Sequence, residues 1–83
     1  MKTKKQIQQD KDIVLPLLRK LVKYMKDSPK VLYSAEKMRD AGQITENEYR
    51  IIYMVLGSRS IGIWDQDLQW VKREIKDIEL NGV

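Results

Sequence analysis

The chain has 83 residues, a mass of 9.8 kDa and a net charge of +4, and it contains neither cysteine nor histidine. That length suits one small domain with a single core. The missing residue types exclude disulfides, zinc sites of the Cys/His kind, cysteine nucleophiles and histidine bases. Charged residues make up 34% and apolar residues 42%, a balance typical of neither a membrane-spanning nor a disordered chain.

The first predicted helix begins at Asp10 or Asp12 and extends to residue 27. Its apolar stripe at helical spacing consists of Val14, Leu18, Leu21 and Met25. Pro16 is tolerated in the first turn of a helix but would kink a helix that began near Lys4. We therefore expect the helix to start late, after a basic and partly frayed segment.

Two further helices follow, joined by a glycine turn. Ser28 is a good N-cap and Pro29 a good first helical residue, so we expect the second helix to run from Pro29 to Ala41 and to stop at Gly42. The spacing of its apolar residues gives this helix a modest buried face.

The third predicted helix runs from Glu46 to Leu56, with Gly57 as its stop. Thr45 and Glu48 have the spacing of a capping box. Residues 51–56 are apolar on every side, which predicts that this helix is the central and most buried one. Their β-branched content leaves a strand as the minority alternative.

The fourth predicted helix begins near Trp64 or Asp65 and ends near Glu79. Its apolar seam is formed by Trp64, Leu68, Val71, Ile75 and Ile78. The chain is thus predicted to be all-α, a compact bundle of three to four short helices, with residues 1–11 as the N-terminal segment and 12–83 as a single helical domain. The predicted core consists of Leu18, Leu21, Met25, Ile52, Val55, Leu68, Val71 and Ile75.

Residues 32–56 resemble the helical hairpin of SHOCT-type domains. The likeness rests on an apolar helix, a glycine at position 42, and the run Ile44-Thr45-Glu46-Asn47-Glu48-Tyr49 that opens a second helix. In that family the hairpin is thought to serve in association. The resemblance therefore implies an interaction role and no active site.

Motifs for enzymatic chemistry are missing from the sequence. The four glycines are scattered at positions 42, 57, 62 and 82, so there is no glycine-rich phosphate loop. The run that starts at Asp65 fails as a calcium loop, because Trp70 stands at its sixth position where glycine is required. We predict a non-enzymatic protein without catalytic, cofactor-binding or metal-binding residues and without a cofactor.

Basic residues concentrate at the N-terminal end. Residues 1–30 hold nine basic and three acidic residues, whereas residues 31–83 hold seven basic and nine acidic ones. On a helical wheel, four of the basic residues form a ridge opposite the apolar stripe: Arg19, Lys20, Lys23 and Lys26. Such a ridge suits a nucleic acid or an acidic protein, or it is a solvated face.

Two aromatic residues are candidate interface anchors. Trp70 lies about 120° from the centre of the fourth helix's seam by helical geometry. Tyr33 falls on the polar side of the second helix. Exposed aromatic residues bury a large rigid area at low entropic cost, so both are predicted partner-binding residues. For Trp70, packing under the connector of residues 58–63 is an equally weighted alternative.

These features predict a small helical protein that acts by binding another protein, such as an acidic one, or by binding a second copy of itself. Its Lys- and Ile-rich composition is in the style of accessory regulators or inhibitors of phages and mobile elements. The alternatives are a small DNA-binding regulator that uses the basic ridge and an immunity-type helical protein. The longest apolar run, residues 51–56, is far shorter than the roughly 20 residues that a bilayer requires, so we expect a cytoplasmic protein without a membrane span.

Overall fold

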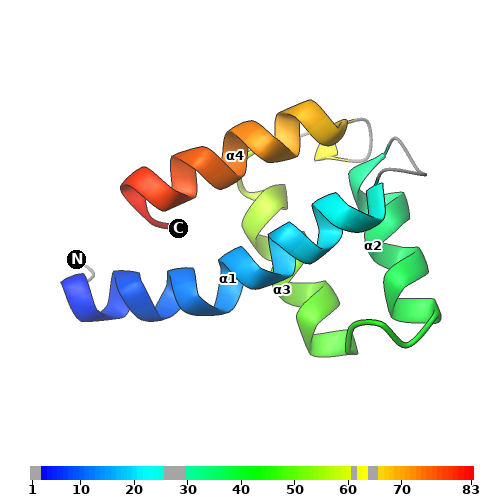
Figure 1. Ribbon diagram of the computed structural model, residues 1–83, viewed down its shortest axis with the longest axis horizontal. Coiled ribbons are helices and arrows are strands. Elements are labelled where there is room, and N and C mark those ends of the chain that lie inside the picture. Colours follow the sequence, from blue (N-terminus) through cyan, green and yellow to red (C-terminus); the bar gives the residue numbers. More distant parts are fainter. Residues whose placement is uncertain (1–2, 26–29, 61, 64–65) are drawn as a thin grey trace.

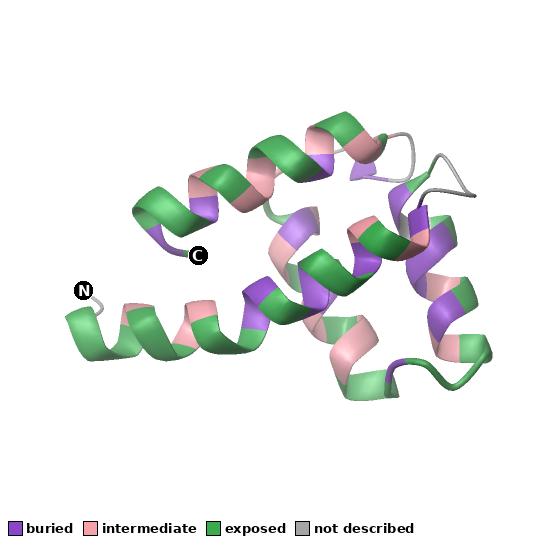
Figure 2. Ribbon diagram, viewed as in Figure 1, coloured by how far each residue is buried: buried purple, intermediate pink, exposed green. Residues whose placement is uncertain are grey.

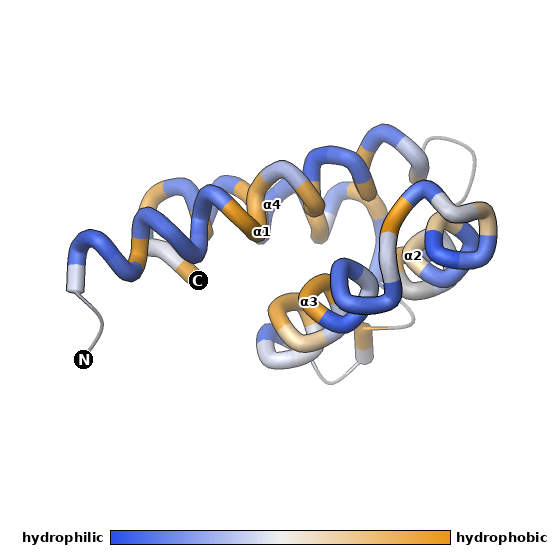
Figure 3. Tube along the Cα trace, turned by 90° about the horizontal axis from the view of Figure 1, so that it is seen from below, coloured by the Kyte–Doolittle hydropathy of each residue, from blue (hydrophilic) through white to orange (hydrophobic). Residues whose placement is uncertain are grey.

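In the computed structural model, which describes residues 3–25, 30–60, 62–63 and 66–83, the chain folds into an all-α bundle as predicted. Its helices are α1 (Lys4–Tyr24), α2 (Val31–Asp40), α3 (Glu46–Gly57) and α4 (Leu68–Asn81). Helices α1 and α4 lie side by side and antiparallel (Figure 1). Helices α2 and α3 lie together on one side of that pair when the molecule is seen from below (Figure 3).

Helix α1, rather than α3, is the central element. It packs against each of the other three helices. Most of its buried side chains are leucines, and the full set is Val14, Leu15, Leu17, Leu18 and Leu21. On α3 only Ile52 and Leu56 are fully buried. The expectation that residues 51–56 form the most buried helix is therefore wrong, because α3 is covered on one side only.

The start of α1 also differs from the prediction. The helix begins at Lys4, and the Thr3 side chain caps it by accepting a hydrogen bond from the Gln6 amide at 3.1 Å. Pro16 thus lies inside the helix. Proline lacks an amide proton, so the Asp12 carbonyl loses its intrahelical donor. Both residues are exposed, which leaves that carbonyl on the solvent side.

Helix α2 begins two residues later than predicted. Its N-cap is Lys30, which makes no side-chain capping bond, and the predicted cap and first residue, Ser28 and Pro29, lie outside the described residues. The predicted stop at Gly42 is confirmed. Gly42 has a φ of +74°, and the amides at 42 and 43 donate to the carbonyls of Arg39 and Met38. This is the Schellman arrangement, which favours glycine because its left-handed residue has no Cβ clash.

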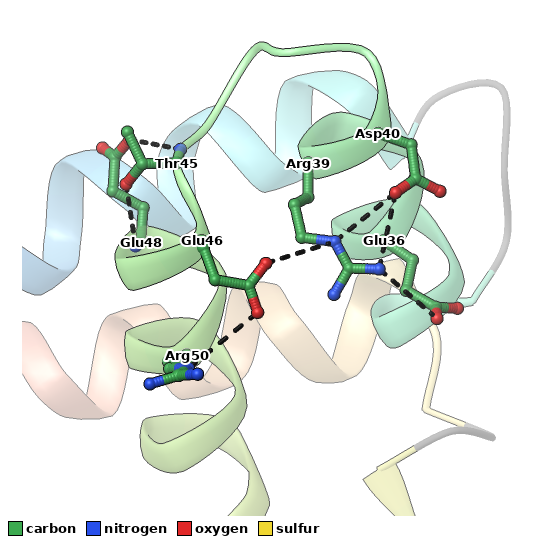
Figure 4. Close-up of polar contacts among 7 residues, drawn as sticks. All are labelled: Glu36, Arg39, Asp40, Thr45, Glu46, Glu48 and Arg50. Atoms are coloured by element: carbon green, nitrogen blue, oxygen red, sulfur yellow. Dashed lines mark hydrogen bonds and ion pairs between the residues drawn. The ribbon is translucent and has the colours of Figure 1, made fainter.

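The capping box of α3 is confirmed in both of its hydrogen bonds. The Glu48 amide donates to the Thr45 hydroxyl at 3.1 Å, and the Thr45 amide donates to the Glu48 carboxylate at 2.8 Å (Figure 4). Gly57 is the last residue of the helix, with Ser58 as the C-cap, so it does not act as the residue beyond the end.

Helix α4 begins at Leu68 rather than near Trp64 or Asp65, which lie outside the described residues. Its N-cap is Asp67, whose carboxylate accepts a hydrogen bond from the Trp70 amide at 3.0 Å. An N-cap aspartate satisfies an amide that the helix leaves unpaired and places negative charge at the positive end of the helix dipole.

The predicted core is largely correct (Figure 2). Five of its members are buried, namely Leu18, Leu21, Met25, Ile52 and Val71. The other three, Val55, Leu68 and Ile75, are half-buried and pack against the core. The buried face expected on α2 is also present, although the list of core residues did not include it: Val31, Ala35 and Met38 are wholly inaccessible.

Candidate interaction surfaces

The predicted basic ridge on α1 is divided between two neighbours. The Arg19 guanidinium contacts the Glu79 carboxylate of α4 at 3.1 Å. The Lys20 ammonium instead donates to the backbone carbonyl of Gln43, in the turn between α2 and α3. Lys23 is exposed, and Lys26 lies outside the described residues. Two of the three ridge cations that the structure describes are therefore engaged by neighbouring elements.

The two predicted aromatic anchors have different surroundings. Trp70 is half-buried and packs against the core. Tyr33 is 57% exposed on α2, and the Lys37 ammonium lies 5.8 Å from the centre of its ring. Tyr33 matches the exposure expected of an anchor better than Trp70 does.

A network of charges ties α2 to α3 across the Gly42 turn (Figure 4). Arg39 lies 3.7 Å from Glu46 and 3.4 Å from Asp40, and its guanidinium stands 4.3 Å from the centre of the Tyr49 ring. Burial lowers the pKa of Arg39, but Glu46 and Asp40 outweigh that effect and raise it above its usual value. Burial, and then the charge of Glu36, raises the pKa of the Tyr49 hydroxyl. These shifts follow from packing and pairing within the hairpin.

A second network fastens the α3–α4 connector to α4. Arg59 is 19% exposed, and its guanidinium donates to Glu74 at 3.1 Å, to Asp77 at 2.7 Å and to the Gly82 carbonyl at 3.3 Å. Hydrogen bonds from Arg59 and then from Asn81 lower the pKa of the Asp77 carboxyl. Charge-assisted bonds of this kind favour the ionised carboxylate.

The described residues contain no group of three or more histidine, cysteine, aspartate or glutamate side chains that could hold a metal ion. In the same part of the chain, no helix is both long enough and apolar enough to cross a bilayer.

The outer face of α3 is an apolar surface that the sequence reasoning did not identify. Met54 is 70% exposed and Tyr53 is 46% exposed. Ile51 and Val55, on the flank that faces α1, are half-buried. Residues 51–57 include no charged side chain. We call this surface, made of Ile51, Tyr53, Met54 and Val55, the α3 face.

A hollow flanks the α3 face on each side. The first lies towards α1 and the end of the chain, and it is lined by Asp10, Ile13, Val14, Ile51, Val55 and Val83. The second lies towards the connector and is lined by Tyr53, Met54, Gly57, Ser58, Ser60 and Ile63. Met54 therefore stands on a ridge between two hollows whose walls are mainly apolar.

The periodicity of the sequence held a signal for this surface. On a helical wheel, Met54 lies opposite Ile52 and Leu56, and Tyr53 lies at the side. A bundle this small cannot cover a helix on every side, so a helix that is apolar all round must leave one apolar side open.

Comparisons with protein-family models, with curated proteins and with solved structures find no significant match. The likeness of residues 32–56 to a SHOCT-type hairpin therefore stays a resemblance, although these residues do form two helices joined by a turn.

Proposed function

We propose that this protein acts by binding a protruding amphipathic helix of another protein on the α3 face, as an accessory regulator or inhibitor. The observation that carries the proposal is the α3 face itself, an uncharged ridge between two apolar hollows. Interface cores are depleted of charged residues and enriched in methionine and aromatic residues. The α3 face has that composition in a chain in which 34% of residues are charged.

The bundle does not need the exposed part of this face, Tyr53 and Met54, in order to fold, whereas Ile51 and Val55 pack against its core. Its core runs through all four helices, and no buried side-chain polar atom of the described residues lacks a hydrogen-bond partner. A large exposed apolar patch on an otherwise complete domain marks a binding site. The face is therefore available to a partner that arrives after folding.

The size of the face favours a helix from another protein over a second copy of this chain. The α3 face spans residues 51–55, so its ridge is only about 7 Å long along the helix and about 10 Å wide. Contact between two such ridges would bury much less than the ~800 Å² per partner of a stable interface. In a second copy, α3 is flanked by its own α1 and connector and cannot enter the hollows. A protruding helix can enter them and bury their walls as well.

Site-specific photo-crosslinking in the source cell tests the proposal. A benzoylphenylalanine residue in place of Met54 should form an adduct with one partner, at a segment with an amphipathic helical pattern. The same probe in place of Tyr33, which is similarly exposed, should not form it. Ile51→Asp should abolish the adduct because it places a charge at the edge of the face.

A second variant is needed in case Ile51→Asp unfolds the protein. Ser58→Lys puts a long cation into the hollow near the connector, at an exposed C-cap where positive charge is compatible with the helix dipole. It should also abolish the adduct, with an unchanged melting temperature. An adduct only with a second copy of the chain, equal adducts from positions 54 and 33, or no adduct at all would overturn the proposal.

A further inference from the structure

Two carboxylates of α4, Glu74 and Asp77, lie on the other side of the helix from Lys72 and Lys76. Glu74 and Asp77 both contact Arg59 of the connector, at 3.1 and 2.7 Å. Asp67 caps the helix, and Glu79 contacts Arg19 of α1. Every carboxylate on α4 and at its N-cap is thus already engaged.

The cations of α4 have no such partners. Lys72, Arg73 and Lys76 are exposed, and none of them forms an ion pair with a described residue. Lys72 and Lys76 are four residues apart, so they share one flank of the helix. Glu74 and Asp77 lie on the flank that faces Arg59. These two carboxylates pair with Arg59 and Glu79 pairs with Arg19, so Lys72 and Lys76 are the charges on their flank of α4 that have no ion-pair partner among the described residues.

The contact between Arg19 and Glu79 brings this flank beside α1. The two helices are antiparallel (Figure 1), so one turn further along α1 is one turn back along α4. Lys11 meets the Glu79 backbone and Ile7 meets Gly82, so Arg19, two turns after Lys11, lies level with Lys72, and Lys23 lies level with the start of α4. We call the resulting strip of four cations, Arg19, Lys23, Lys72 and Lys76, the basic seam. Glu79 is the carboxylate at one end of it.

We propose that the basic seam binds the phosphate backbone of double-stranded DNA without reading its sequence. Lysine acts as a point charge toward phosphate, and successive seam cations on one helix are about 6 Å apart. The nearby aromatic residues, Tyr24 and Trp70, are half-buried against the core, so the seam offers no platform for stacking unpaired bases. Its middle also lacks the apolar anchor that an acidic protein partner would require. The seam is separate from the α3 face, so this proposal does not depend on helix binding there.

Fluorescence anisotropy with a labelled random-sequence duplex of about 25 base pairs, measured between about 50 and 200 mM NaCl, tests the proposal. Three to four phosphate contacts predict a slope of about −3 for log affinity against log salt concentration. Lys72→Gln combined with Lys76→Gln should reduce the slope by about 2 and weaken binding more than tenfold at the lower salt concentration. Lys37→Gln combined with Arg50→Gln removes the same charge from α2 and α3, and it should change the affinity less than twofold.

Glu79→Gln provides a variant that should gain affinity. It removes the carboxylate of the seam and releases Arg19, so it should tighten binding several-fold and steepen the slope by about 1. All of these side chains are exposed, and thermal melting should show that each variant stays folded. Equal losses in the two double variants, no effect of Glu79→Gln, or absence of duplex binding at about 50 mM salt would overturn the proposal. Displacement of the duplex by polyglutamate at equal charge concentration would also overturn it, in favour of an acidic protein.

Discussion

Arg59 shows how one residue of a connector can organise a helix. It is mostly buried, and it donates to two carboxylates of α4 and to the backbone carbonyl that follows the helix. A guanidinium suits this role because its fork of donors can reach several acceptors at once. Trp70 lies four residues before Glu74 and seven before Asp77, so it shares the flank of α4 that Arg59 covers. The helical wheel of α4 placed Trp70 outside the apolar seam because a wheel does not include the connector, whose Arg59 covers that flank.

The lowered pKa of Asp77 predicts a loss of stability in acid. A carboxyl whose pKa is lower in the folded state than its unfolded value of 3.8 stabilises the fold fully above that value, and the contribution disappears as pH falls through the folded pKa. The melting temperature should therefore drop below about pH 4. Asp77→Asn should remove part of this drop, and Asn81→Ala should remove a smaller part. Calorimetry between about pH 2 and 7 measures the drop in melting temperature. Identical pH profiles for the unchanged protein and the two variants would contradict the prediction.

Gly82→Ala should destabilise the fold by about 1–2 kcal/mol. Gly82 has a φ of +85°, and an added Cβ would stand 2.8 Å from the Cγ2 of Ile7. Ile7 is β-branched and cannot easily turn away. Gly62→Ala is the matched control, because nothing lies within 4 Å of its Cβ position and its φ is not positive. Urea unfolding of both variants decides the point, and equal stabilities would show that the contact with Ile7 is unimportant.

At the level of helices, the accuracy of the sequence prediction depended on how local the determinants are. The Thr45–Glu48 box and the Gly42 turn are fixed by residues within a few positions of each other, and both were predicted. The early start of α1 was missed because its local cap, Thr3 on the Gln6 amide, was not recognised and because part of its support is remote. Lys11 donates to the Glu79 carbonyl, which lies 68 positions away in sequence. No local pattern around Pro16 contains that information.

Thr45→Ala should cost about 1 kcal/mol of stability, because it removes the acceptor for the Glu48 amide. Glu48→Ala should cost less, since it leaves the hydroxyl cap in place. Amide hydrogen exchange should become faster in the first turn of α3 in both variants. Unchanged exchange there in Thr45→Ala would show that the cap does not stabilise the helix.

The two faces of α3 should respond in opposite ways to truncation. Ile52 is fully buried, so Ile52→Ala should cost about 2–5 kcal/mol. Met54 is 70% exposed, so Met54→Ala should change stability by no more than about 0.5 kcal/mol. Chemical denaturation of the pair measures the difference. A large loss for Met54→Ala would mean that the α3 face serves folding and is not free for a partner.

Apolar and charged side chains occupy different surfaces of the bundle. The α3 face is apolar, the basic seam lies on α1 and α4, and the flank of α4 that carries Glu74 and Asp77 is covered by the connector. The sequence alone indicated an excess of positive charge and one helix that is apolar on every side. It could not indicate which cations are engaged, because Arg19 and Lys20 find their partners only in the folded chain.

The bundle is also uneven along its length. The first half of α1 and the last turns of α4 extend together beyond α3 (Figure 1). The fully buried residues of α1 begin only at Val14, so the earlier turns are supported chiefly by α4. Pro16 lies where the two halves of α1 meet, and it has no amide proton to donate to the helix there. The two halves should therefore differ in local stability.

Native-state hydrogen exchange should resolve these two halves. The amides of residues 8–12 should exchange roughly tenfold or more faster than those of residues 18–22, because the earlier turns can open while the core stays closed. Lys11→Ala removes the bond to the Glu79 carbonyl, and it should accelerate exchange in residues 8–12 while leaving residues 18–22 unchanged. If both segments exchange at one rate and respond together to Lys11→Ala, α1 opens as a single unit. The contacts with the end of α4 would then stabilise the whole bundle rather than its extended end.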